Sequence, residues 1–132
     1  MIIGIGIDIV NIDRIKNAIK KYGPKFFNRI FTINEINYSS SYGNLAYAKF
    51  ATRFAAKEAC LKALGTGYSS GISFKDIEII RHEKSSPKVE LHGKALEHLT
   101  SRYKDFKIFL SLSDDASFAI ANVVIEGEFE KE

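Results

Sequence analysis

The segment Arg53–Gly67, RFAAKEACLKALGTG, most constrains the fold of this 132-residue chain. With the residues before it, it predicts a long central helix over Leu45–Leu64, ended by the Gly65–Gly67 turn. At about 100° of rotation per residue, large apolar side chains form a stripe that should face a core. Three alanines form a separate strip, where a neighbouring backbone could approach closely. The stripe holds Phe50, Phe54, Leu61 and Leu64, and the strip holds Ala56, Ala59 and Ala63.

The charges on this helix are unusual for a purely structural element. Lys57 projects into the apolar stripe, and Lys49, Arg53 and Lys57 follow one another at intervals of four, where like charges repel. Glu58 and Lys62 share a third side. The pattern indicates an anionic ligand such as a phosphate. A structural explanation remains open, in which Glu58 and Lys62 form an exposed ion pair and Lys57 extends its ammonium group to solvent.

The N-terminal residues Ile2–Val10 alternate as a strand does, with Gly4, Gly6 and Asp8 on one face. Glycines weaken a strand unless something must come close to its backbone. Asp8 and Glu58 are the kind of oxygen donors that hold Mg²⁺ together with substrate phosphates. The backbone amides of the Gly65–Gly67 turn could bind phosphate oxygens. Asp8 could instead cap the following turn, and the glycine turn could be only a helix stop.

The remaining pattern predicts an α+β domain, with a mostly antiparallel sheet packed against the long central helix. We expect one domain over residues 1–126, a charged, mobile connection over Arg81–Ser86, and a polar tail over residues 127–132 with little reason to be ordered. The other expected elements are a helix ending at Tyr22, a helix over Lys25–Phe31, a short helix opened by the capping box Thr32–Glu35, strands over Ile72–Ile80, Pro87–Leu91, Phe106–Ser113 and Ser117–Ile125, and a helix over Gly93–Tyr103.

Composition excludes several classes of function. The single cysteine, Cys60, rules out an internal disulfide framework and suits a reducing, cytoplasmic compartment. The sequence shows no signal peptide and no apolar run long enough to cross a membrane. A net charge of +3 is small for a nucleic-acid-binding surface. The motifs of zinc sites, P-loops and serine nucleophile elbows are missing from the sequence.

Three segments together resemble the holo-(acyl-carrier-protein) synthases, the small bacterial class of 4'-phosphopantetheinyl transferases. They are Gly4–Val10, Arg53–Gly67 and Ser111–Ala119, which match in order and separation. The similarity spans nearly the whole chain. The resemblance implies the 4'-phosphopantetheinyl transferase fold. It also implies transfer of phosphopantetheine from coenzyme A, the co-substrate, to a serine of an acyl carrier protein for fatty acid synthesis. The implied cofactor is Mg²⁺, and the implied assembly is a homotrimer with active sites between subunits.

The resemblance also assigns residues by position. Asp8 and Glu58 are the expected metal ligands. Glu58 and Lys62 are the expected catalytic residues, with Lys62 stabilising the charge that develops during transfer. The expected coenzyme-binding residues are Arg53, Lys57, Lys62, Gly65 and Pro87.

One position departs from the family pattern. Relatives usually carry histidine just after the Ser111–Ser113 element, whereas this chain has Asp114. A carboxylate near a pyrophosphate should weaken coenzyme binding. Alternatively, Asp114 and Asp115 simply form a hairpin turn, which is the interpretation we favour.

Basic residues gather in the first helix and just after it. Arg14, Lys21 and Lys25 are expected to bind the acidic acyl carrier protein, because a complementary charge speeds encounter. A run of lysines is also a common solvated face. The alternative function is an inactive binding module that recognises an acidic partner through this helix.

Overall fold

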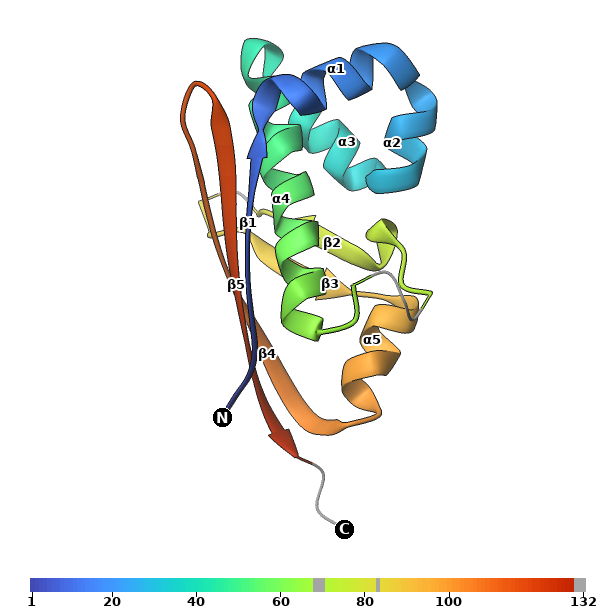
Figure 1. Ribbon diagram of the computed structural model, residues 1–132, viewed down its shortest axis with the longest axis vertical. Helices are drawn as coiled ribbons and strands as arrows, with labels where there is room; N and C mark the ends of the chain where they lie inside the picture. The colour runs from blue at the N-terminus through green and yellow to red at the C-terminus, as the bar shows by residue number, and fades with distance from the viewer. Residues whose placement is uncertain (68–70, 83, 130–132) are drawn as a thin grey trace.

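The computed structural model describes residues 1–67, 71–82 and 84–129, and it confirms the α+β class (Figure 1). The long central helix is α4. The elements in chain order are β1 (Ile2–Asn11), α1 (Ile12–Tyr22), α2 (Pro24–Ile30), α3 (Ile33–Ser40), η1 (Gly43–Leu45), α4 (Ala46–Leu64), η2 (Phe74–Asp76), β2 (Ile77–Ile80), β3 (Lys88–Leu91), α5 (Gly93–Thr100), β4 (Tyr103–Asp114) and β5 (Phe118–Phe129).

The strands of the described residues form two antiparallel sheets rather than one. The larger sheet has the order β1-β5-β4, and the smaller sheet consists of β2 paired with β3. Helix α4 lies between them, packing on β1 and β5 with one side and meeting α1, α3 and β2 with the others (Figure 1). The core therefore surrounds α4, which explains why so much of this helix is buried.

Two glycines of β1 set the distance between the sheet and α4. A Cβ atom on Gly4 would overlap the carbonyl oxygen of Ala63, and one on Gly6 would overlap that of Ala59. The alanine strip is thus the surface that a neighbouring backbone approaches, as predicted. The close approach requires glycine on the strand and alanine on the helix.

The C-terminal strand is longer than the sequence suggested. Strand β5 continues to Phe129, because Gly127 exchanges backbone hydrogen bonds with Met1 and is in register with Phe106 of β4. Residues 127–129 therefore belong to the sheet and not to a polar tail, while 130–132 lie outside the described residues. The expected strand Ile72–Ile80 is also shorter, since η2 occupies Phe74–Asp76 before β2 begins.

The outer face of the larger sheet is apolar and uncovered in the single chain. Ile5, Ile7 and Ile9 of β1 are each 58–67% exposed, because their strand neighbours face α4 instead. Phe118 and Ile120 of β5 are exposed beside them. None of the helices within the described residues has the length and apolar character to span a bilayer.

Candidate active site

The β1-facing side of α4 brings together an acidic and a basic side chain. Lys62 Nζ lies 3.1 Å from Asp8 Oδ1 and donates to the Ile7 carbonyl oxygen at 2.9 Å. The Asp8 side chain is 18% exposed, whereas that of Lys62 is 55% exposed. Glu58, which is partly buried, precedes Lys62 by one helical turn and so lies on the same side of α4. Lys62 of α4 thus forms an ion pair with Asp8 of β1.

Asp8 and Glu58 are suited to a hard divalent cation. Both offer carboxylate oxygens, which are the ligands that Mg²⁺ prefers, and substrate phosphate oxygens usually complete its coordination. Gly6, two residues before Asp8 and on the same face of the strand, keeps β1 close to α4. Asp8 and Glu58, which are far apart in the sequence, therefore lie on the side of α4 that faces β1.

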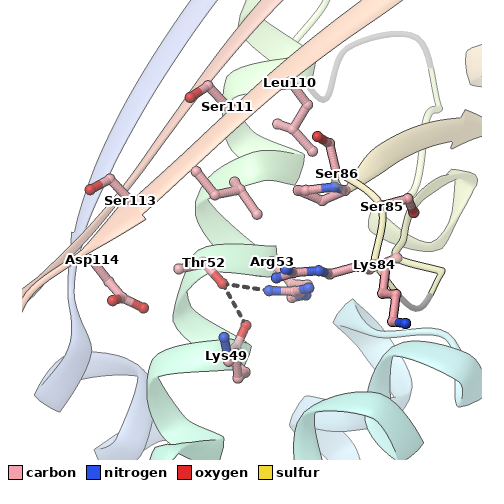
Figure 2. A pocket seen from close by; sticks show the side chains of 13 residues that line it. Lys49, Thr52, Arg53, Lys84, Ser85, Ser86, Leu110, Ser111, Ser113 and Asp114 are labelled. Carbon is pink, nitrogen blue, oxygen red and sulfur yellow. Dashed lines mark hydrogen bonds between the residues drawn. The ribbon is translucent and has the colours of Figure 1, made fainter.

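A cavity of about 590 Å³ lies on a different side of α4, between this helix, β4 and the connection from β2 to β3 (Figure 2). Its described lining carries four cationic residues and several hydroxyl groups, so it suits an anionic ligand. Neither Asp8 nor Glu58 nor Lys62 lines it. The lining residues are Lys49, Thr52, Arg53, Arg81, Lys84, Ser85, Ser86, Pro87, Leu110, Ser111, Leu112, Ser113 and Asp114.

Arg53 is the buried cation of this cavity. It is only 3% exposed, its Nη1 donates to Thr52 Oγ1 at 2.9 Å, and its guanidinium lies 4.5 Å from the ring centre of Tyr38. Burial lowers the pKa of the guanidinium, although the neighbouring Tyr38 hydroxyl opposes that shift. Its Nη2 has no hydrogen-bond partner among the described residues. Arg53 and Pro87, which are far apart in the sequence and were both predicted to bind coenzyme A, line the same cavity.

Lys57 does not reach this cavity, contrary to its predicted place in the coenzyme pocket. Its side chain is fully buried and its ammonium donates to Glu35 Oε1 at 2.8 Å, to the Phe74 carbonyl at 2.9 Å and to the Ile77 carbonyl at 2.5 Å. Burial lowers the pKa of Lys57, with Glu35 opposing the shift. Three acceptors take up the three ammonium hydrogens. Lys57 therefore does not extend to solvent, and its ammonium hydrogens are used within the interior.

Gly65 serves as the helix stop. It has left-handed backbone angles (φ 77°), and its N–H donates to the carbonyls of Leu61 and Lys62. The structure therefore shows a helix stop whose amide is engaged within the helix cap, and coenzyme binding at Gly65 stays a prediction.

The two aspartates after Ser113 have different positions. Asp115 forms the turn, since its Oδ1 accepts from the N–H groups of Ser117 and Phe118, both at 2.8 Å. These backbone donors hold the pKa of the Asp115 carboxyl below its usual value. Asp114 instead ends β4 and lines the cavity (Figure 2). The turn interpretation holds for Asp115 alone.

The predicted partner-binding residues belong neither to the contact between Asp8 and Lys62 nor to the lining of the cavity beside Arg53. Arg14 and Lys21 on α1 and Lys25 on α2 are all exposed. The buried side of α1 consists of isoleucines, which hold the helix against α4 and leave its charges in solvent.

Sequence reasoning missed part of the cationic lining. Arg81 and Lys84 line the cavity, yet their segment suggested only a charged connection. The signal was the concentration of charge and serine between two strands, which a loop beside an anion site also shows. Glu83, in the same segment, lies outside the described residues.

Comparisons with known proteins identify the family of this chain. The family model of the 4'-phosphopantetheinyl transferase superfamily matches residues 4–121, and the chain belongs to this superfamily. More narrowly, it is a phosphopantetheinyl transferase of the holo-(acyl-carrier-protein) synthase kind. The synthase of Clostridium tetani is 51% identical over 128 residues, covering 97% of this chain and 98% of the relative.

Solved structures show the same fold. The Bacillus anthracis synthase, in complex with coenzyme A (3',5'-ADP), matches with a TM-score of 0.77 and 36% identity, covering 97% of this chain and 98% of that one. The Helicobacter pylori synthase, in complex with coenzyme A, matches with a TM-score of 0.78 and 36% identity, covering 92% and 99%.

Proposed function

We propose that this chain transfers the 4'-phosphopantetheine group of coenzyme A to a serine of an apo acyl carrier protein, with Mg²⁺ held by Asp8 and Glu58. The observation that carries the proposal is the contact between Lys62 Nζ and Asp8 Oδ1 at 3.1 Å, on the side of α4 that also bears Glu58. Two carboxylates and a lysine are the side chains that a metal-bound pyrophosphate requires.

The protein needs no nucleophile of its own for this reaction. The serine oxygen of the partner forms a bond to phosphorus, and the bond from phosphorus to the nucleotide phosphate breaks. Bound Mg²⁺ would neutralise the pyrophosphate, while Lys62 stabilises the charge that develops on it. We assign Glu58 to accept the serine proton. Cys60 takes no part, because burial raises the pKa of its thiol to about 12.

We assign the cavity beside Arg53 to the nucleotide end of coenzyme A. A buried guanidinium nitrogen without a partner is costly, and a phosphate oxygen would satisfy it. Lys49, Arg81 and Lys84 add charge around it, and Pro87 supplies an apolar wall. The Bacillus anthracis and Helicobacter pylori relatives are complexes with coenzyme A, which supports the same ligand here.

The metal ligands and this cavity lie on different sides of α4, so we propose that a complete site forms between two copies of the chain. One copy would supply Asp8, Glu58 and Lys62, and the next would supply the cavity with Arg53. The uncovered apolar face of β1, β4 and β5 supports such an assembly, which we propose is a homotrimer.

The carrier protein is proposed to bind along α1 and the start of α2. Arg14, Lys21 and Lys25 are exposed there and carry the positive charge that an acidic partner requires. We place the reaction in the cytoplasm, where it supplies holo acyl carrier protein for fatty acid synthesis. The alternative of an inactive binding module is not favoured, because the chain belongs among enzymes.

Mass spectrometry of apo acyl carrier protein tests the proposal directly. Incubation with the protein, coenzyme A and Mg²⁺ should add one phosphopantetheine to the carrier protein. The Glu58→Ala variant and a chelator should each abolish the mass gain. An unchanged mass with a carrier protein that another transferase can modify would reject the activity, and a gain that survives Glu58→Ala would reject the metal site.

A further inference from the structure

The hairpin of β2 and β3 places two carboxylates directly opposite each other. Glu78 and Glu90 are partners in the antiparallel register, and Glu78 is only 7% exposed. Like charges at directly opposed positions destabilise a sheet, and burial of one of them increases the cost. The arrangement therefore calls for a positive charge between the two side chains.

His92 directs a ring nitrogen to this position. Its Nε2 lies 3.1 Å from Glu78 Oε1 and 3.7 Å from Glu90 Oε1. His92 follows Glu90 by two residues, so it continues the same face just after β3 ends. The three ligand atoms all lie within 4.8 Å of one another.

We propose that Glu78, Glu90 and His92 form a binding site for a divalent transition-metal ion, with Zn²⁺ as the best match. Imidazole nitrogen and carboxylate oxygen bind Zn²⁺ at about 2.0–2.2 Å, and tetrahedral ligands at that distance lie about 3.3 Å apart. The separations of 3.1 and 3.7 Å from His92 Nε2 bracket this value. A water molecule would be the fourth ligand.

Residues outside the cluster orient its buried ligand. Glu78 Oε2 accepts from Thr32 Oγ1 at 2.6 Å and from Asn34 Nδ2 at 3.3 Å, which leaves Oε1 directed toward His92. Such outer hydrogen bonds are typical of metal-binding carboxylates. The His92 and Glu90 side chains are 44% and 59% exposed, so an ion can enter from solvent.

The ion would join parts of the fold that come from separate segments of the chain. It would link β2 to β3 and, through His92 as the N-cap residue, to α5, while Thr32 and Asn34 connect Glu78 to α3. The site is separate from Asp8 and Glu58, so its role is to stabilise this half of the protein. Binding to the folded state alone raises the melting temperature with metal concentration.

Calorimetric titration of the full chain with Zn²⁺ tests the site, alongside the Zn²⁺ dependence of the melting temperature. The variants are His92→Gln and Glu90→Gln. His82→Gln is the matched control, because His82 is exposed outside the cluster. Asp8→Asn controls for binding at the proposed magnesium site. We expect one site that both cluster variants weaken by about tenfold or more, with loss of the thermal shift, and that the two controls retain.

Three results would overturn the proposal. Equal Zn²⁺ affinity in the wild type and His92→Gln would show that the cluster does not bind the ion. Loss of the site in Asp8→Asn or His82→Gln would place the ion elsewhere. Absence of any Zn²⁺ binding would leave Glu78 and His92 as an ion pair only.

Discussion

Lys57 Nζ lies 2.8 Å from Glu35 Oε1, and neither side chain has any solvent exposure. Glu35 also accepts from the N–H of Thr32 through Oε1 and from that of Ile79 through Oε2, both at 2.8 Å. The pair therefore joins α3, α4 and β2 at one point in the interior. Lys57 is adjacent to Glu58 in the sequence, yet the two side chains lie on different sides of α4.

Replacing Lys57 with methionine should destabilise the protein strongly. The Lys57→Met variant leaves the Glu35 carboxylate buried without its cation, and breaking a buried pair in this way costs about 3–5 kcal/mol. Denaturant unfolding measures the loss. The double variant Lys57→Met/Glu35→Gln removes both charges and should recover part of it. A single variant as stable as the wild type would contradict the structural role of the pair.

Substitution of Gly6 by alanine should disturb both stability and the active site. The new methyl group would overlap the Ala59 carbonyl oxygen, and forced overpacking typically costs about 1–3 kcal/mol. Because β1 must move away from α4, the contact of Asp8 with Lys62 should also weaken. We expect a lower melting temperature in thermal unfolding and a lower transfer activity.

Gly127→Ala is the matched control for Gly6→Ala. Its Cβ would come too close to the flexible end of the Ile3 side chain, which can rotate away, and would make an ordinary contact with the Asp105 carbonyl oxygen at 3.5 Å. We expect a smaller loss of stability and normal transfer. Equal effects at the two positions would argue against a special role for the close approach to α4.

Asp114→Asn should improve binding of coenzyme A. Asp114 lines a cavity otherwise rich in cations, and its charge repels the phosphates proposed to enter there. Since the side chain is exposed, we expect a decrease in the KM for coenzyme A of about two- to fivefold at low salt, and less at high salt. In the control Asp115→Asn, the turn hydrogen bonds are altered while the KM stays near that of the wild type. A higher KM for Asp114→Asn would instead make the carboxylate a ligand contact.

Charge reversal on α1 should affect the carrier protein and leave coenzyme A unaffected. In the double variant Arg14→Glu/Lys21→Glu, the KM for acyl carrier protein should rise about tenfold or more at low salt, and the difference should shrink as salt screens the charges. Steady-state kinetics with each substrate varied in turn measures this. Lys104→Glu, an exposed change on β4, is the control. Lys104→Glu changes the net charge by half as much as the double variant, so an effect of half the size or more would show that net charge alone is responsible.

Ile7→Asp should prevent self-association. Ile7 is 63% exposed in the centre of the apolar face, and a carboxylate there would be buried in the proposed trimer. Light scattering after gel filtration should give a trimer for the wild type and a monomer for the variant, with transfer activity lost. A fully active monomer would contradict a site shared between copies.

Local pattern was sufficient to predict much of this protein. The periodicity of Leu45–Leu64 predicted the central helix, the alanine strip predicted a close backbone contact, and the alternation of Ile2–Val10 predicted its strand. The resemblance added the family. Whether Asp8, Glu58 and Lys62 bind metal and phosphate is still a prediction, although the structure does bring Asp8 and Lys62 into contact.

What the tertiary structure decided depends on residues far apart in the sequence. Helical spacing gives Lys49, Arg53 and Lys57 the same appearance, but Arg53 lines a cavity whereas Lys57 meets Glu35 from α3 in the interior. Strand β5 extends to Phe129 because Met1 and β4 offer backbone partners there. A sequence pattern fixes the side of an element on which a side chain lies. The packing of other elements determines whether that side meets solvent, a ligand or a buried counter-charge.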